Sequence, residues 1–505
     1  MAKTKVKKTG TSVPSPPHAT SVQYLELLQN LSKISEEEAI IFRKEKNISV
    51  DTGDSNGQSA EIFKPVIRFS DSSAVLPKGL LKICDGFEDI PSAIQSQTWP
   101  YALTFSKSIV GIAETGSGKT IAFGIPAIAK VIHLSGTKKN VPNGKYSPDV
   151  LILAPTRELA IQIGETIEKA TGFLEKPIKS TVIYGGVDRS SQLAHLLSTK
   201  PQILIATPGR LLDYLSEDEL SLFTVSYFVL DEADRMLDMG FAPDVKRIVN
   251  AMDSTLSRQT LMFSATWPST IKRLADSLIK GPSVRISVTS RSELLTSTDN
   301  SQFSPSSLKG GSTIKQIVTV VDDHQEKEKI LFSLLSKYSS GKIILFVLYK
   351  KEADRIEQVL LKKGYKVSTI HGDKAQSARA SALATFKDGK SLILLATDVA
   401  SRGLDIPFVE TVINYTFPLT IEDYVHRIGR TGRAGRSGVA HTIFSPLDKN
   451  HSGELIGVLR NSGQDVPQEL LAFGTATKKR EHKDYGSHYK EIDPSIKPKH
   501  FKFDD

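Results

Sequence analysis

The sequence predicts two α/β domains in tandem, each built on a parallel sheet with helices on both faces. Short apolar runs alternate along the chain with segments of helical pattern, as in repeated βαβ units. The alternation occurs in two series, separated by a Ser/Thr-rich stretch over residues 289–312 that predicts a flexible linker. At 505 residues, the chain is long enough for two or three domains of ordinary size.

Residues 1–65 precede the first series and predict a largely disordered extension, because they mix basic, Ser/Pro-rich and acidic stretches. One part of this extension has a helical pattern, carried by Tyr24, Leu25, Leu28 and Leu31. A short amphipathic helix there can dock a partner, and a transient helix without a role fits the same spacing.

The first domain is predicted over residues 66–288. Its expected strands are so uniformly apolar that they indicate burial on both faces of a sheet. They are SIVGIA (108–113), VLILAP (150–155), STVIYGG (180–186), QILIAT (202–207), YFVLDEAD (227–234) and TLMFSAT (260–266).

The second domain is predicted over residues 313–465, and a flexible basic tail over residues 466–505. The expected strands of this domain repeat the same rhythm. They are KIILFV (342–347), KVSTIHG (366–372), LILLAT (392–397), TVINY (411–415) and GVAHTIF (438–444). In the tail, KKREHK (478–483) fits an additional contact with nucleic acid, a nuclear import signal or a solvated surface.

The composition excludes several classes of protein. No window approaches the roughly 18 apolar residues of a membrane span, and the basic start MAKTKVKKTG lacks the apolar core of a secretory signal, so we expect an intracellular chain with no membrane partner. The single cysteine, Cys84, excludes a disulfide framework and a cysteine metal site, and a buried position is expected for it.

The charge indicates a polyanionic partner. The net charge is +9 and the pI is about 9.2. The excess of basic side chains is larger over residues 313–477 than over the other segments, so a nucleic-acid surface is expected on the folded core.

The segment AETGSGKT (113–120) follows an expected strand and precedes a helical pattern, which is the setting of a phosphate-binding loop. Its glycine-rich turn allows backbone N–H groups to converge on phosphate oxygens. Lys119 adds a positive charge, and Thr120 offers a hydroxyl to Mg²⁺. The candidate nucleotide-binding residues are Thr115, Gly116, Ser117, Gly118, Lys119 and Thr120. Ala113 departs from the usual pattern, which begins with glycine.

A second chemical signal is the acidic segment Asp231-Glu232-Ala233-Asp234, at the end of an expected buried strand. In phosphate-binding-loop folds, an acid at this edge of the sheet holds Mg²⁺, and a neighbouring carboxylate can polarise the attacking water. We therefore predict Asp231 as a metal ligand and Glu232 as the general base.

A third signal is HRIGRTGR (426–433) in the second domain. A phosphate-binding loop alone lacks positive charge opposite the γ-phosphate, and arginines supplied from elsewhere accelerate hydrolysis by roughly 10³ to 10⁵. Arg430 and Arg433 are the candidates for this role.

Taken in order from about residue 69 to residue 445, these segments resemble the DEAD-box RNA helicases of helicase superfamily 2. The resemblance implies two RecA-like domains, the cofactors ATP and Mg²⁺, and RNA as partner. It implies that Gln95 hydrogen-bonds the adenine and Phe69 stacks on it, that Asp405 lies near the ribose, and that His426 links the ATP and RNA sites. SAT (264–266) is similar to the element that couples hydrolysis to strand separation.

The same resemblance implies which residues bind RNA, mainly through its sugar-phosphate backbone. In the first domain these are Pro155, Thr156, Arg157, Gly185, Gly186, Thr207, Pro208, Gly209 and Arg210. In the second domain they are Arg379, Thr397 and Arg402. The family further implies a monomer whose domains close on ATP and RNA, although the linker 289–312 is longer than usual.

Three segments resemble one subgroup, the fungal nucleolar DEAD-box helicases of large ribosomal subunit assembly. They are TWP (266–268), LYKKEADRI (348–356) and FGTATKKREHKDYG (473–486). This subgroup implies ribosomal precursor RNA and pre-ribosomal assembly proteins as partners, and a location in the nucleus and nucleolus. An ATP-regulated RNA clamp, a helicase of messenger RNA metabolism and a DNA-translocating helicase are the alternatives, the last disfavoured by the segments around Gln95, SAT and HRIGRTGR.

Overall fold

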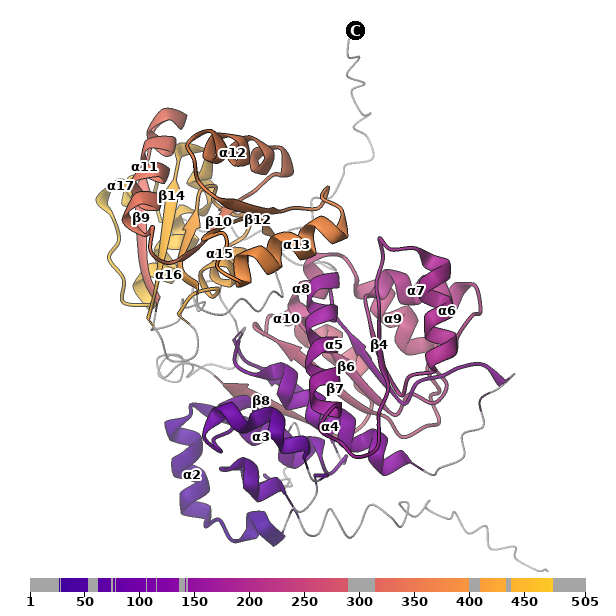
Figure 1. Ribbon diagram of the computed structural model, residues 1–505. Coiled ribbons are helices and arrows are strands. Elements are labelled where there is room, and N and C mark those ends of the chain that lie inside the picture. The colour runs from indigo at the N-terminus through magenta and orange to yellow at the C-terminus, as the bar shows by residue number, and fades with distance from the viewer. Residues whose placement is uncertain are drawn as a thin grey trace, which may run out of the picture.

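The computed structural model describes residues 27, 29–52, 62–73, 76–77, 79–105, 107–114, 116–135, 141, 144–288, 314–398, 409–432 and 437–475. They form two α/β bodies, an indigo-to-magenta one and an orange-to-yellow one (Figure 1). Within these residues, no helix combines the length and the apolar character that crossing a membrane would require.

The first body contains an eight-stranded sheet. Its elements are α2 (Glu36–Glu45), β1 (Ile48–Asp51), η1 (Phe69–Ser72), η2 (Leu80–Phe87), α3 (Ala93–Ala102), β2 (Ser108–Ile112), α4 (Lys119–Leu134), β3 (Val150–Leu153), α5 (Arg157–Thr171), β4 (Ser180–Ile183), α6 (Arg189–Thr199), β5 (Ile203–Ala206), α7 (Pro208–Ser216), β6 (Tyr227–Leu230), α8 (Ala233–Asp238), α9 (Ala242–Asn250), β7 (Gln259–Ser264), α10 (Ser269–Leu278) and β8 (Ser283–Val288).

The second body contains a six-stranded sheet. Its elements are β9 (Ile314–Val320), α11 (His324–Lys337), β10 (Lys342–Val347), α12 (Lys350–Lys362), β11 (Val367–Ile370), α13 (Gln376–Lys387), β12 (Ile393–Thr397), β13 (Val409–Asn414), α15 (Ile421–Ile428), β14 (Gly438–Phe444), η5 (Pro446–His451), α16 (Ser452–Asn461) and α17 (Gln468–Leu471).

Both sheets are covered on two faces, which explains their uninterrupted apolar strands. The strand orders are β1-β8-β2-β7-β6-β3-β5-β4 and β11-β12-β10-β13-β14-β9, and all pairings are parallel except that of β1 with β8. Helices α3 to α5 pack on one face of the first sheet and α6 to α10 on the other. In the second domain, α11 and α12 cover one face, and α13, α15, α16 and α17 cover the other. The predicted fold is confirmed.

Every predicted apolar run forms a strand, and three strands were not predicted: β1, β8 and β9. The prediction that residues 1–65 are largely disordered is wrong for residues 29–51. Leu31, Ile34, Ala39 and Ile48 are buried in the core of the first domain, and β1 takes its hydrogen-bond partner from β8. A four-residue strand depends on that distant partner, so its local sequence carries little signal.

Two other predictions at the domain ends are changed by packing. Leu27 and Leu31 bury their side chains within the first domain, so the helical pattern is used inside this chain, while Tyr24, Leu25 and Leu28 lie outside the described residues. At the other end, Leu470 and Phe473 pack on the second core, so the prediction of a flexible tail is wrong for this part of residues 466–505, and residues 476–505 lie outside the described residues.

Candidate ATP and RNA sites

The predicted phosphate-binding loop connects β2 to α4. Gly116 and Gly118 have positive φ values of 82° and 91°, and Gly118 is the N-cap of α4. Both positions suit glycine, because L side chains are strained in this region. The ammonium group of Lys119 donates hydrogen bonds to the carbonyls of Ala113 (2.8 Å) and Glu114 (2.9 Å). The loop therefore folds around its own lysine, with Thr120 in the first turn of α4.

Gln95 ties helix α3 to this loop. Its Oε1 accepts from the backbone N–H of Ser92 (2.9 Å), and its Nε2 donates to the carbonyl of Gly118 (3.0 Å). A Cβ atom at Gly118 would lie 2.5 Å from Nε2, so glycine also permits this close approach. Both polar atoms of the Gln95 amide thus bind the protein here.

Phe69 lies in η1 with only 3% of its surface exposed. Its ring packs against Trp99, with 5.4 Å between the centroids. The ring is therefore part of the first core in this arrangement, and its predicted stacking on adenine stays a prediction. Trp99 is fully buried, as expected of a packing residue.

The acidic segment lies where β6 ends and α8 begins. Asp231 is buried, and burial raises its carboxyl pKa to about 7, with a further rise from the charge of Glu232 and an opposing effect of Lys119. Its Oδ1 accepts from the backbone N–H of Glu232 (3.0 Å). Glu232 adopts a left-handed conformation (φ 48°) as the N-cap of α8.

Asp234 connects this segment to SAT (264–266). Its Oδ2 accepts from the backbone N–H groups of Ala265 (2.9 Å) and Thr266 (3.1 Å), and from the Thr266 hydroxyl (3.3 Å). SAT is therefore held by the carboxylate of the neighbouring acidic segment, a role that the sequence did not assign to Asp234.

The donor set fits a nucleotide with its cation. The phosphate-binding loop supplies left-handed glycines and a lysine, and Thr120 and Asp231 are oxygen donors of the kind that Mg²⁺ prefers. Among the residues that the structure describes, no three His, Cys, Asp or Glu side chains group as a metal site. A cation here would depend on phosphate and water oxygens as well.

In the first domain, the predicted RNA-binding residues form two groups. Thr156 caps α5, accepting from the N–H of Leu159 (3.3 Å), and Pro155 precedes it. Arg157 lies against Gly186, where a Cβ would approach its guanidinium, and beside Gly185. The structure therefore brings PTRELA (155–160) and the glycine pair together.

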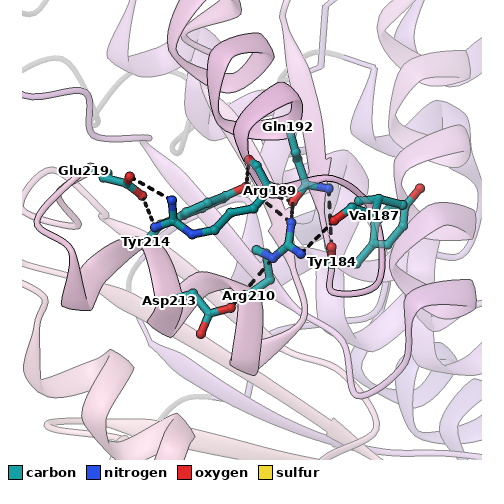
Figure 2. Close-up of polar contacts among 8 residues, drawn as sticks. All are labelled: Tyr184, Val187, Arg189, Gln192, Arg210, Asp213, Tyr214 and Glu219. Carbon is teal, nitrogen blue, oxygen red and sulfur yellow. Dashed lines mark hydrogen bonds and ion pairs between the residues drawn. The ribbon is translucent and has the colours of Figure 1, made fainter.

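Arg210 belongs to the second group, with Thr207 as N-cap of α7 and Pro208 in its first turn, followed by Gly209. Figure 2 shows its guanidinium donating to Gln192 Oε1 (2.9 Å) and to the carbonyl of Val187 (3.0 Å). Only 7% of Arg210 is exposed. These contacts position the chain after the glycine pair. Direct contact of Arg210 with RNA stays a prediction.

In the second domain, the motif residues are anchored by a buried ion pair. Arg427 donates through Nε and Nη2 to the two carboxylate oxygens of Asp398, each at 2.6 Å, and through Nη1 to the carbonyl of Thr416 (2.6 Å). Only 2% of Arg427 is exposed. Asp398 directly follows Thr397, the last residue of β12.

The comparisons with known proteins agree with this geometry. The DEAD/DEAH box helicase family model matches residues 92–274, and the helicase conserved C-terminal domain model matches residues 326–435. The ATP-dependent RNA helicase DBP3 of Vanderwaltozyma polyspora is 49% identical over 419 residues, covering 82% of this chain and 74% of that protein. Its namesake from Ajellomyces capsulatus is 42% identical, covering 99% and 96%. The chain is a DEAD-box ATP-dependent RNA helicase.

A solved structure supports the two-domain fold of this helicase. S. cerevisiae Dbp5 bound to RNA and ADP BeF3 matches with a TM-score of 0.63 and 28% identity, covering 77% of this chain and 93% of that one. The predicted family, its RNA-dependent ATPase activity and its use of ATP are thus confirmed. The roles of individual residues stay predictions.

The helicase joins its two domains through an ion pair that the sequence did not predict. Arg379, near the start of α13, lies 2.5 Å from the carboxylate of Glu158 on α5, and α13 faces the first domain in Figure 1. Both side chains are about nine-tenths buried. Burial lowers the Arg379 pKa, the Glu158 charge raises it, and neighbouring Arg157 lowers it again. Two predicted RNA-binding residues therefore lie at this contact, Arg157 of the first domain and Arg379 of the second.

The predicted arginines of HRIGRTGR are only partly described. Arg430 is buried, and its Nε donates to the carbonyl of His426 (3.3 Å), one helical turn earlier. Thr115, Arg402, Asp405 and Arg433 lie outside the described residues. Sequence reasoning missed Arg427, because the partners that bury it, Asp398 and the carbonyl of Thr416, lie 29 and 11 positions away in the sequence.

Proposed function

We propose that this helicase remodels ribosomal precursor RNA, or its complexes with pre-ribosomal proteins, during large ribosomal subunit assembly in the nucleolus. The observation that carries this proposal is the resemblance of TWP (266–268) and LYKKEADRI (348–356) to the fungal nucleolar subgroup. The fungal relatives at 42% to 49% identity support it, since their match extends well beyond the shared motifs.

Nucleotide binding would begin at the loop around Lys119. Its ammonium group now donates to two loop carbonyls, and ATP phosphates would replace them. Gln95 would release Gly118 to reach the adenine, with Phe69 beside it, which couples base recognition to the shape of the loop. Thr120 and Asp231 would hold Mg²⁺, which neutralises phosphate charge.

In the hydrolysis step, Glu232 would accept a proton from the attacking water. Arg430 and Arg433 would reach the γ-phosphate from the second domain, with Asp405 at the ribose and His426 between the ATP and RNA sites. A movement of Glu232 during hydrolysis would shift the nearby Asp234. Asp234 would in turn shift SAT, since it accepts hydrogen bonds from two backbone N–H groups of that segment. A single chain supplies the loop and both arginines, so we propose a monomer.

RNA would be held across both domains through phosphates and sugar hydroxyls, without much reading of sequence. The proposed RNA-binding set is Arg157, which adjoins Arg379, the glycine pair 185–186 against Arg157, and Thr397 and Arg402 of the second domain. The ion pair of Arg379 with Glu158 would hold the domains together while RNA is bound. Its breakage would accompany reopening.

Crosslinking of the tagged full-length helicase to RNA in cells tests the proposal. We expect crosslinks concentrated on ribosomal precursor RNA and nucleolar localisation of the protein. Scattered sites on messenger RNA would instead favour the alternative role in messenger RNA metabolism.

A strand-displacement assay separates unwinding from clamping. We expect release of a short duplex with ATP, whereas ATP-dependent retention on RNA without strand release would favour an assembly factor that clamps RNA.

A further inference from the structure

The segment over residues 36–51 contacts α3, the helix that carries Gln95, and strand β8 near the edge of the first sheet. Figure 1 shows α2 at the outer end of this domain, beside α3. At its first contact, Arg43 donates to Gln97 Oε1 (2.9 Å) and to the carbonyl of Phe63 (2.8 Å). Gln97 lies on α3, two residues from Gln95, so the segment braces the helix that holds the phosphate-binding loop.

The second contact is at the edge of the sheet. Strand β1 pairs antiparallel with β8, and Asp51 is the register partner of Arg285. The Asp51 carboxylate and the Arg285 guanidinium lie 2.5 Å apart. Their side chains are 54% and 36% exposed. Such an exposed pair contributes little to global stability, about 0 to 1 kcal/mol.

Arg285 also reaches the SAT segment. Its guanidinium lies over the ring of Trp267, 5.7 Å from the centroid, within the range of a cation–π contact. Trp267 directly follows Thr266, whose backbone N–H and hydroxyl bind Asp234. A continuous set of contacts therefore runs from Asp51 through Arg285 and Trp267 to the acidic segment.

We propose that Asp51 and Arg285 are positioning residues for ATP hydrolysis, acting through Trp267 on SAT and Asp234. The ion pair holds the Arg285 guanidinium over the indole ring of Trp267. Because Trp267 directly follows SAT, this contact restricts the position of the SAT backbone. Asp51, which precedes the helicase motifs in the sequence, thereby contributes to the rate of the chemical step. This inference uses the established ATPase activity and is independent of which RNA the helicase serves in cells.

The test compares Asp51→Asn, Arg285→Gln and Arg285→Lys in the full-length helicase, using RNA-stimulated phosphate release. Asp51→Asn and Arg285→Gln should each lower kcat about two- to fivefold. A contact worth up to about 1 kcal/mol changes a rate by up to about fivefold when it acts only in the transition state. The KM for ATP and the half-saturating RNA concentration should stay unchanged. Arg285→Lys, which keeps the charge, should retain most of the kcat.

Two further measurements separate positioning from a general loss of structure. In a double-mutant cycle, Asp51→Asn should have little added effect in the Arg285→Gln background, because both act through one contact. The emission of Trp267, obtained by subtracting the spectrum of Trp267→Phe, should change in both single variants. Glu328→Gln is the matched control, since it removes an exposed 2.6 Å ion pair with Arg355 in the second domain and should leave kcat and emission unaltered.

An unchanged kcat in Arg285→Gln would overturn the inference, as would a loss of kcat in Arg285→Gln that Asp51→Asn does not share. Additive effects in the cycle, or an equal loss in the Glu328→Gln control, would also overturn it. All of these outcomes are independent of the crosslinking result.

Discussion

The two domains hold their motif residues by different means. In the first, Asp234 accepts hydrogen bonds from neutral backbone N–H groups of SAT, and Gln95 binds the carbonyl of Gly118. In the second, the buried Arg427 and Asp398 hold each other by two charged hydrogen bonds. Backbone contacts of the first kind can be exchanged for nucleotide contacts at small cost, whereas a buried ion pair is costly to open. The first domain is therefore suited to rearrangement, and the second to rigidity.

The largest expected effect is on chemistry in the first domain. Glu232→Gln should lower the RNA-stimulated kcat by roughly 10²- to 10⁴-fold, because it removes the proposed general base. ATP binding and the unfolding midpoint should be retained, since this residue is assigned to catalysis rather than to anchoring. Phosphate release and binding of a labelled nucleotide measure this. Full turnover in the variant, with Glu328→Gln as an isosteric control, would remove the assignment.

The next effect tests the rigid anchor of the second domain. Arg427→Ala should destabilise this domain by about 3–5 kcal/mol, because it leaves the buried Asp398 without its partner. Urea unfolding followed by circular dichroism should show the loss. Arg355→Ala, which breaks the more exposed pair with Glu328 and a hydrogen bond to the Tyr415 hydroxyl (3.2 Å), should cost less, about 1–2 kcal/mol. Equal losses in the two variants would contradict the comparison.

Acid should act on the second domain through His441. Burial lowers its pKa to about 4, helped by Lys337 and Lys315, and its Nε2 lies 2.9 Å from the Tyr338 hydroxyl. The unfolded chain takes up this proton near pH 6.5, so the contribution is complete above that pH and is lost as the pH falls toward 4. The loss should be about 2 kcal/mol at pH 5 and about 3 kcal/mol at pH 4. Unfolding free energies at pH 7.5, 6 and 5 measure it, and His441→Gln should flatten this part of the profile.

The smallest effect concerns the hydrogen bonds by which Asp234 holds SAT. Asp234→Asn should weaken its hydrogen bonds by about 1–2 kcal/mol, because a charged acceptor becomes neutral. Hydrogen exchange at the amides of Ala265 and Thr266 should then accelerate roughly 10-fold, with the amides within β7 as internal controls. An unchanged exchange rate would mean that SAT is held by its packing instead.

The sequence alone determined the fold class, the enzyme family and the strands that carry the motifs. Short, fully apolar runs between turn signals indicate strands buried on both faces, and the motif spacing around Lys119 and Asp231 depends on local chain geometry. These signals are short in range, so they can be recognised without knowing what the rest of the chain does.

Only the tertiary structure decided which motif side chains anchor and which are accessible. Arg210 and Arg427 were unremarkable members of basic motifs, yet each is buried among partners distant in sequence. Likewise, β1 and the pair of Asp51 with Arg285 exist because residues 234 positions apart meet at the edge of one sheet. The physical reason is that a hydrogen bond or ion pair depends on where the partner lies in space. Local sequence specifies the side chain, and the packed fold supplies its partner.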